Sequence, residues 1–149
     1  MNTVQEMLEV KGHVVWSVNR ELSVFELVQK MAEKKVGALT VVDDKDNLVG
    51  IVSERDYTRK MMLLDKDSHQ THVSDIMTEK VLTVFAESTI EKCMALMSEN
   101  SIRHLPVVRG SKLIGIISVG DLLKAIIEKQ SETIEELESF IYEESGGEG

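Results

Sequence analysis

Apolar and polar positions follow the same order twice along this chain. In each half, a short apolar run, at 14–18 and at 81–85, precedes a segment with apolar residues three or four positions apart, which predicts a strand followed by an amphipathic helix. Two further apolar runs joined by a polar turn predict a pair of strands. A second amphipathic stretch closes each half, at 54–64 and at 119–129, so the pattern predicts two β-α-β-β-α units.

The two halves also match residue by residue. Residues 22–42 align with 88–108 and residues 48–63 with 113–128, and ten of the 37 aligned positions are identical. Strands that read as nearly continuous apolar runs are expected to be covered on both faces, and one unit of about 60 residues would be only marginally stable alone. The sequence therefore predicts an α/β fold in which two repeats pack sheet against sheet around a pseudo-two-fold axis and leave a cleft between them.

A further helix is predicted after the second repeat. Ser131 has the residue type of a helix N-cap, and apolar residues follow on one face of a helix at Ile134, Leu137, Phe140 and Ile141. This stripe is expected to dock on the core of the chain or on a second subunit, and we favour the second, a homodimer. The predicted segments are repeat 1 at 8–65, a linker at 66–79, repeat 2 at 80–130, the extra helix at 131–144 and a disordered tail at 145–149.

Composition changes this picture mainly by exclusion. The chain is 42% apolar, enough for a packed core, and its net charge of −9 argues against binding to nucleic acid, which needs a basic surface. Cys93 is the only cysteine, so an intramolecular disulfide is impossible, and its apolar neighbours predict an inert buried thiol. The start of the sequence lacks a signal-peptide pattern, and no apolar run approaches the roughly 20 residues of a membrane span, so a soluble, cytoplasmic protein is expected.

The strongest candidate for chemistry is a Ser-x-x-Asp motif that ends both copies of the last strand, as Ser53 with Asp56 and as Ser118 with Asp121. Such a pair at a strand-to-helix junction is a helix capping box. A capping box would accept Thr, Asn or Glu as well, yet both copies use Ser and Asp, and both follow a glycine at the same distance. A carboxylate at a helix start can also accept both hydroxyls of a ribose, while backbone amides and the Ser hydroxyl bind phosphate or sugar oxygens. Both interpretations stay open at this point.

The two units resemble a tandem pair of CBS domains, known as a Bateman module. The resemblance rests on “KVGALTVVDDKDNLVGIVSERD” and “SIRHLPVVRGSKLIGIISVGD”, covers about residues 8–130, and is similar in wording to the stand-alone two-repeat proteins of bacteria and plant organelles. It implies an adenosyl-nucleotide sensor whose ligand is AMP, ADP, ATP, NAD(H) or S-adenosylmethionine, with AMP the first expectation. It also implies that the ribose aspartate of one repeat works with the opening and second strands of the other.

Carried over onto this sequence, the resemblance implies two clefts. In the first, Asp56 would hold the ribose beside Ser53, and in the second, Asp121 and Ser118 would take these roles. The first cleft would be completed by Leu82 and Thr83 at the adenine, by Ile102 and Pro106 on the far wall and by Arg55, Arg103 and His104 at the phosphate, and the second by Val15, Trp16, Val36, Gly37 and Ala38.

The two implied clefts differ in charge. The second has small residues at the two positions where the first has Arg103 and His104, so the first is better equipped for a phosphorylated nucleotide. Trp16, the only tryptophan, could instead belong to the core. Cations that reach in from elsewhere could reverse the preference between the clefts, and the candidates are Lys34, Lys35 and Arg59.

Three functions are weighed against these residues. The first is a regulatory nucleotide sensor without catalysis, a homodimer that acts on a separate effector protein. The second is a dimerisation or redox-partner protein whose clefts are unused. The third, an enzyme, is disfavoured because the sequence has no nucleophile–base pair, no P-loop and no clustered catalytic carboxylates. A metal site is disfavoured too, because His69 and His72 lack helical periodicity and a second ligand cluster.

Overall fold

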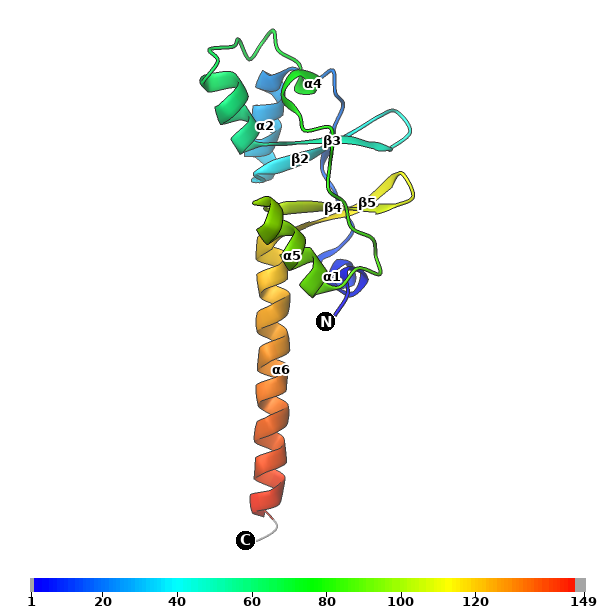
Figure 1. Cartoon of the computed structure of the whole chain (residues 1–149), viewed down its shortest axis with the longest axis vertical. Coiled ribbons are helices and arrows are strands. Elements are labelled where there is room, and N and C mark those ends of the chain that lie inside the picture. The colour runs from blue at the N-terminus through cyan, green and yellow to red at the C-terminus, as the bar shows by residue number, and fades with distance from the viewer. Residues whose placement is uncertain (1, 147–149) are drawn as a thin grey trace.

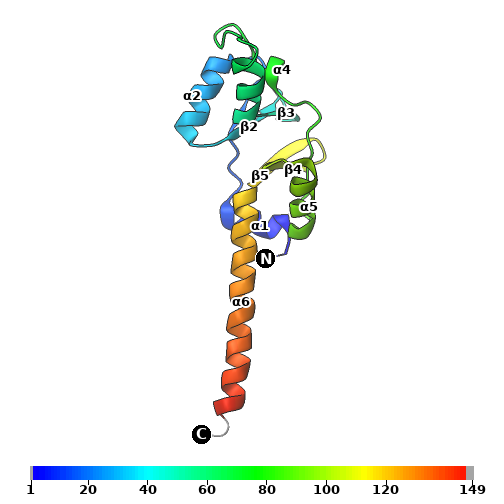
Figure 2. The ribbon, with the colours of Figure 1, turned by 60° about the vertical axis from the view of Figure 1, so that its left-hand side comes forward.

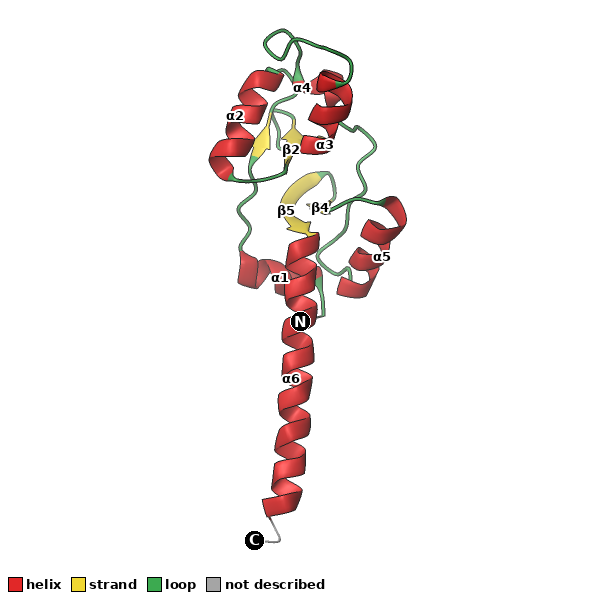
Figure 3. Cartoon of the chain, turned by 90° about the vertical axis from the view of Figure 1, so that its left-hand side faces the viewer, coloured by secondary structure: helices red, strands yellow, loops and turns green. Residues whose placement is uncertain are grey.

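The computed structural model describes residues 2–146 and places two small sheets in two lobes, one for each predicted repeat (Figure 1). The strands lie in the middle, where the lobes meet, and the helices lie outside them (Figure 3). The predicted α/β fold with two repeats is therefore confirmed. The first lobe contains β1 (Ser17–Val18), α2 (Val24–Lys34), β2 (Ala38–Val42), β3 (Leu48–Ser53), α3 (Glu54–Tyr57) and the π-helical turn η1 (Thr58–Met62). The second contains α5 (Ile90–Asn100), β4 (His104–Arg109), β5 (Lys112–Ser118) and α6 (Val119–Gly146), while α1 (Val4–Lys11) and α4 (Val73–Ile76) precede the two repeats.

The two sheets are built on the same antiparallel pair. In the first lobe the order is β1-β2-β3, and β2 runs antiparallel to β3 with Ala38 opposite Ser53. In the second lobe β4 runs antiparallel to β5 with His104 opposite Ser118. Each Ser of the repeated motif therefore ends a strand beside the first residue of the neighbouring strand. This register brings the candidate site residues to the same end of each sheet.

The opening strands are shorter than predicted. Only Ser17–Val18 of the predicted strand 14–18 pairs with a neighbour, in parallel with β2. Of 81–85, Val84 alone pairs, through a parallel bridge to Val107. The apolar runs therefore predict both opening strands as longer than they are.

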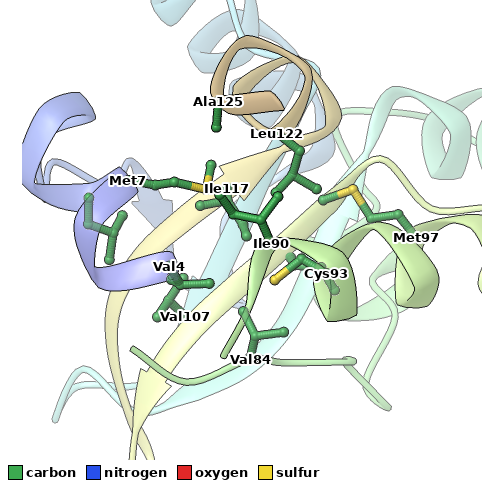
Figure 4. Packing of buried hydrophobic residues seen from close by; sticks show 12 residues of the cluster. Val4, Met7, Val84, Ile90, Cys93, Met97, Val107, Ile117, Leu122 and Ala125 are labelled. Carbon is green, nitrogen blue, oxygen red and sulfur yellow. The ribbon is translucent and has the colours of Figure 1, made fainter. Parts of the chain in front are cut away.

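Each lobe is completed by the segment that precedes the other repeat. In the second lobe, α1 places Val4, Met7 and Leu8 in the core, where Met7 lies close to Ile117 and Val4 lies close to Val107 (Figure 4). The backbone amide of Val4 donates to the carbonyl of Ser88 at 2.9 Å, which fixes the start of α1 beside α5. The first residues of the chain therefore belong to the core of the repeat that lies furthest from them in sequence.

The first lobe receives α4 in the same way. Val73, Ile76 and Met77 lie in its core, and the amide of Val73 donates to the carbonyl of Leu22 at 2.8 Å. The predicted linker at 66–79 thus contains part of the first lobe. Residue 8, predicted as the start of repeat 1, lies inside a helix of the second lobe.

The repeated glycines have a packing reason. A Cβ atom on Gly50 would lie 2.7 Å from the sulfur of Met77, and one on Gly115 would lie 2.8 Å from a methyl group of Leu8. Both glycines therefore let the segment that precedes the other repeat approach the sheet closely, through Met77 in the first lobe and through Leu8 in the second. Their repetition before the Ser-x-x-Asp motif follows from packing and does not bear on a ligand.

The prediction of a separate helix at 131–144 is wrong in its starting point. A single helix, α6, runs from Val119 to Gly146 and projects well beyond the second lobe (Figures 1 and 2). No glycine or proline lies between Asp121 and Ser145, so nothing in this stretch interrupts the helix. Ser131 is an ordinary helical residue, and residues 147–149 of the predicted tail lie outside the described residues.

Candidate functional site

A cleft of about 560 Å³ lies between the two lobes and is lined by both repeats. Its volume falls within the range of about 300–1,000 Å³ that is typical of small-molecule sites. The first lobe contributes the end of β3 and the start of α3, and the second contributes the segments before β4 and after α4. The lining residues are Gly37, Ala38, Ile51, Ser53, Glu54, Arg55, Asp56, Arg59, Thr78, Lys80, Val81, Leu82, Ile102, Arg103 and His104.

Asp56 both caps α3 and lines this cleft. Its Oδ2 atom accepts hydrogen bonds from the backbone amide of Ser53 at 2.9 Å and from the Ser53 hydroxyl at 3.1 Å. The amide of Asp56 in turn donates to the Ser53 hydroxyl at 3.3 Å, which completes a capping box. Oδ1 lies 3.3 Å from the ammonium group of Lys60, and the side chain of Asp56 is 15% exposed. The capping interpretation is therefore correct for Oδ2, and Oδ1 is the oxygen without a backbone donor.

Cations outnumber carboxylates around the cleft, although the whole chain is acidic. Arg55, Arg59, Lys80 and Arg103 line it, against Glu54 and Asp56. The guanidinium of Arg55 donates from Nη1 to the carbonyl of Ser101 at 2.9 Å, so this side chain ties the first lobe to the second. The local excess of positive charge suits an anionic ligand.

His104 is a weaker source of positive charge than the sequence indicated. Burial lowers its pKa below 6.5, and the positive charges of Lys11 and Arg103 lower it further, while Asp121 and Glu54 act in the opposite direction. The imidazole is therefore neutral at pH 7. It can offer a hydrogen bond to a ligand in the cleft, and the arginines carry the charge.

The second Ser-x-x-Asp motif is in a different state. Asp121 caps α6, since its Oδ2 accepts from the Ser118 amide at 2.8 Å and its own amide donates to the Ser118 hydroxyl at 3.1 Å. The ammonium group of Lys11 also donates to Asp121 Oδ2 at 2.6 Å and to the carbonyl of Ile116 at 2.7 Å. Burial by itself would raise the pKa of Asp121, but the hydrogen bonds from Lys11 and from the Ser118 amide outweigh it and lower the pKa. The carboxylate expected to hold a second ribose already has a cation beside it.

Lys11 was missed in the sequence because no helix was predicted around it. The signal was present: Thr3 and Glu6 have the spacing of a capping box, and Thr3 Oγ1 accepts from the Glu6 amide at 3.3 Å. Lys80 is the counterpart of Lys11 in the first lobe. Lys11 lies three residues after Leu8, and Lys80 lies three residues after Met77, the core residues that pack on the repeated glycines. Lys80 lines the first cleft, and among the described side chains no carboxylate forms an ion pair with it.

The structure gathers some of the predicted site residues and separates others. The cleft contains seven residues predicted for the first cleft, and it also contains Gly37 and Ala38, which were predicted for the second. Trp16 lines a different hollow, where the ammonium group of Lys34 lies 4.1 Å from the centre of its ring. Trp16 is 42% exposed, so the alternative that it belongs to the core is wrong. The remaining predicted residues, Val15, Val36, Thr83, Pro106, Ser118 and Asp121, lie outside the lining of the cleft.

Two other side chains of interest have structural roles. His69 stacks on Phe25 with ring centres 4.1 Å apart, and the described residues contain no group of three His, Cys, Asp or Glu side chains that could hold a metal ion. Burial raises the pKa of the Cys93 thiol to about 11, as expected for an inert thiol. None of the helices in the described part of the chain is both long and apolar enough to span a membrane.

Comparison with known proteins identifies the class of this fold. Residues 9–63 and 73–128 each match the family model of the CBS domain. The chain is 35% identical over 148 residues to the CBS domain-containing protein CBSX3, mitochondrial, of Arabidopsis thaliana, a match that covers 93% of this chain and 71% of that protein. The crystal structure of the CBS-domain protein NE2398 is 48% identical with a TM-score of 0.81, covering 85% of this chain and 99% of that one. A candidate signal-transduction protein with CBS domains from Burkholderia ambifaria MC40-6 is 44% identical with a TM-score of 0.80, covering 87% and 96%.

The chain therefore belongs to the CBS-domain family and carries two CBS domains in tandem. The resemblance inferred from the sequence is confirmed. Proteins of this class with paired CBS domains serve regulation and signal transduction.

Proposed function

We propose that this protein is a regulatory sensor that binds an adenosyl nucleotide in the cleft between its two CBS domains and catalyses no reaction of its own. The observation that carries the proposal is the position of Asp56 at the wall of a cleft rich in cations, where its Oδ1 atom has no backbone donor and is contacted by the ammonium group of Lys60. A carboxylate oxygen without a backbone donor suits the vicinal hydroxyls of a ribose, and guanidinium groups suit a phosphate. Family membership supports the same assignment.

The lining of the cleft suits the three parts of a nucleotide. Leu82 and Ile102 offer apolar surface for a purine base. Asp56 lies at the start of α3, where its carboxylate can accept hydrogen bonds from the hydroxyls of a ribose. Arg59 and Arg103 supply the positive charge that a phosphate needs, because His104 is neutral at pH 7 and supplies none. AMP is the first candidate, and ADP, ATP, NAD(H) and S-adenosylmethionine are the others.

One nucleotide per chain is expected. The cleft with Asp56 is lined by Arg59, Lys80 and Arg103, for which no ion pair is found among the described residues. Lys60 contacts Asp56 at 3.3 Å, whereas Lys11 contacts Asp121 more closely, at 2.6 Å. A ribose at Asp121 would have to displace an ammonium group that makes two hydrogen bonds. The first cleft is therefore the site, and a separate effector protein would respond to its occupancy.

Calorimetric titration with the five candidate ligands tests this function. At about 100 times the dissociation constant, a ligand that binds only the folded protein adds roughly 2.7 kcal/mol to the free energy of unfolding, which thermal unfolding would detect. The variant Asp56→Asn keeps an acceptor for the helix cap but loses the charge, so binding should weaken strongly. Asp75→Asn is the matched control, because Asp75 caps α4 through the amide of His72 at 3.0 Å.

The outcomes separate the two leading interpretations. Loss of binding in Asp56→Asn with retention in Asp75→Asn supports the sensor. No response to any of the five ligands would leave a dimerisation or redox-partner protein with unused clefts. Binding that is equal in wild type and Asp56→Asn would mean that Asp56 only caps α3.

A further inference from the structure

Helix α6 carries an apolar face along its exposed length that its own lobe does not use. Leu123, Ile127, Ile134, Leu137 and Ile141 are each between 47% and 62% exposed. The helix projects beyond the second lobe, so no other described part of the chain covers its outer half (Figures 1 and 2). A face of this size on a protruding helix is unusual for a monomer.

The core of the second lobe uses a different face of α6. Leu122 and Ala125 are buried there against α1 and β5 (Figure 4). The neighbouring Leu123 and Ile127 point to solvent. The helix therefore has two apolar faces near its start, one for its own lobe and one without a partner among the described residues.

The spacing of the unpartnered face is that of a coiled coil. Its members, with Gln130 included, follow one another at intervals of four, three, four, three and four residues. These are the a and d positions of a heptad repeat, with Leu123, Gln130 and Leu137 at d and isoleucine at every a position. A strict 3.5-residue repeat is the narrow seam of paired helices, whereas packing on the side of a globular core uses a wider stripe.

We propose that this face of α6 docks on the same face of α6 in a second copy of the chain, as a parallel two-stranded coiled coil. Isoleucine at a with leucine at d favours two parallel strands. In the parallel register Gln130 meets its own copy and the two amides can hydrogen-bond, whereas in the antiparallel register Gln130 would face Ile134. A buried amide without a partner is costly, so the parallel register is the better one.

The charges of α6 permit this pairing. Glu132, Glu135 and Glu136 fall at the outer positions f, b and c of the heptad, away from the seam. Glu138 falls at an e position, where the parallel register places it beside Thr133 of the second copy. The seam therefore ends at Ile141, because Glu144 falls at the next d position, and within the seam Glu132, Glu135 and Glu136 are turned to solvent.

The area is sufficient for a specific dimer. Full burial of a Leu, Ile or Phe side chain removes on the order of 100 Å² of apolar surface from water, so the five seam residues and Phe140, each about half exposed, hide about 700 Å² in a pair. Because homodimer interfaces are about 65% apolar, the whole interface would be about 1,100 Å², above the roughly 1,000 Å² expected of a biological contact. The face is self-complementary, as a two-fold dimer requires.

Analytical ultracentrifugation of the full chain tests the proposal without any nucleotide. We expect wild type to be a dimer at micromolar concentration and Ile134→Glu, which places a charge in the seam, to weaken the dimer roughly 30-fold or more. Ser139→Glu adds the same charge at an outer position and should leave the dimer unchanged. Circular dichroism of both variants checks that the helix is kept. A monomeric wild type, or equal dimerisation of the two variants, would overturn the proposal.

Cysteine cross-linking tests the orientation. In a parallel pair, Ile141→Cys and Leu123→Cys each lie beside their own copies, so each variant should form a disulfide-linked dimer under mild oxidation. In an antiparallel pair, residue 141 lies beside residue 123, and only a mixture of the two variants would cross-link. Cross-linking in the mixture alone would overturn the parallel arrangement. The native Cys93 is buried and should not interfere.

Discussion

The ammonium group of Lys11 lies 2.6 Å from Oδ2 of Asp121 and ties the N-terminal helix to the second copy of the Ser-x-x-Asp motif. In the first copy Lys60 contacts Oδ1 of Asp56 at 3.3 Å, while Lys80, the counterpart of Lys11, lines the open cleft. The two halves of a duplicated fold therefore present their aspartates in different states. Asp56 lines the cleft and contacts the nearby Lys60, whereas Asp121 is bound by a lysine of α1.

The Lys11→Met variant should change the number of ligands bound. It frees the Asp121 carboxylate and the Ile116 carbonyl, both of which Lys11 contacts, so a second nucleotide can bind there. Titration calorimetry should give one nucleotide per chain for wild type and up to two for Lys11→Met, with the second bound more weakly. Lys92→Met, a change on the exposed surface of α5, should leave the stoichiometry at one. If wild type already bound two nucleotides per chain, the ion pair between Lys11 and Asp121 would not be what prevents binding at the second site.

The same variant should lose stability in a manner that depends on pH. Lys11 lowers the folded-state pKa of Asp121 below 3.8, so the ion pair stabilises the fold above about pH 4 and this contribution is lost as the pH falls through the folded pKa. Both side chains are partly exposed, so Lys11→Met should cost about 0.5–1 kcal/mol at pH 7. Urea unfolding at pH 7 and near pH 2 should find a larger difference at the first pH than at the second. An equal difference at both would assign the loss to packing of the lysine stem.

His104 should make the fold less stable in mild acid. Its folded-state pKa is held below 6.5 by burial and by Lys11, so the unfolded chain takes up a proton first as the pH falls below about 6.5. The free energy of unfolding should therefore decrease from pH 7 to pH 5, and His104→Gln should flatten this decrease. His13→Gln, at an exposed histidine before β1, serves as the control. If the free energy of unfolding decreased by the same amount in His104→Gln, the pH dependence would come from another titratable group.

Two glycine substitutions should have opposite effects. Gly115→Ala brings a Cβ atom to 2.8 Å from Leu8 and forces α1 away from β5, at a cost of about 1–3 kcal/mol. Gly120→Ala meets only the Ser118 hydroxyl at 3.6 Å and replaces glycine in a helix, so it should stabilise by up to about 1 kcal/mol. Denaturant unfolding of both variants measures the contrast. A neutral Gly115→Ala would mean that α1 is held loosely.

Cys93 should resist thiol reagents in the folded protein. The thiol is buried and its pKa is raised to about 11, so little thiolate exists at pH 8. Reaction with a maleimide or disulfide reagent should be slow in buffer and fast in concentrated urea. Fast reaction in buffer would show that α5 opens readily.

The order of elements could be predicted from the sequence because it depends on local periodicity written twice. The antiparallel pairs and the helices α2 and α5 follow directly from apolar spacing. Whether the helix continues through Ser131 could not be decided in this way, because a serine tolerates both an N-cap and a helix interior. The exchange of α1 and α4 between lobes could not be predicted either, since spacing along one segment does not say which core it joins.

The candidate site was predictable in part for the same reason. The Ser-x-x-Asp motifs lie where expected, and the residues of the first cleft that come from both repeats are brought together. Whether Asp121 is free depends on Lys11, more than one hundred positions away, which only the tertiary fold brings near. The pKa of His104 likewise depends on burial between the lobes.

The exchange of leading segments has a consequence for how the protein is made. Once residue 77 has emerged from the ribosome, the buried core residues of the first lobe are all available for folding, including Val73 and Ile76. By contrast, Val4 and Met7 emerge before the first lobe and find their partners Ile117 and Leu122 only after the strands of the second repeat have been made. Until then their apolar surface is open to chaperones, so nascent-chain experiments should find α1 the last helix to become protected.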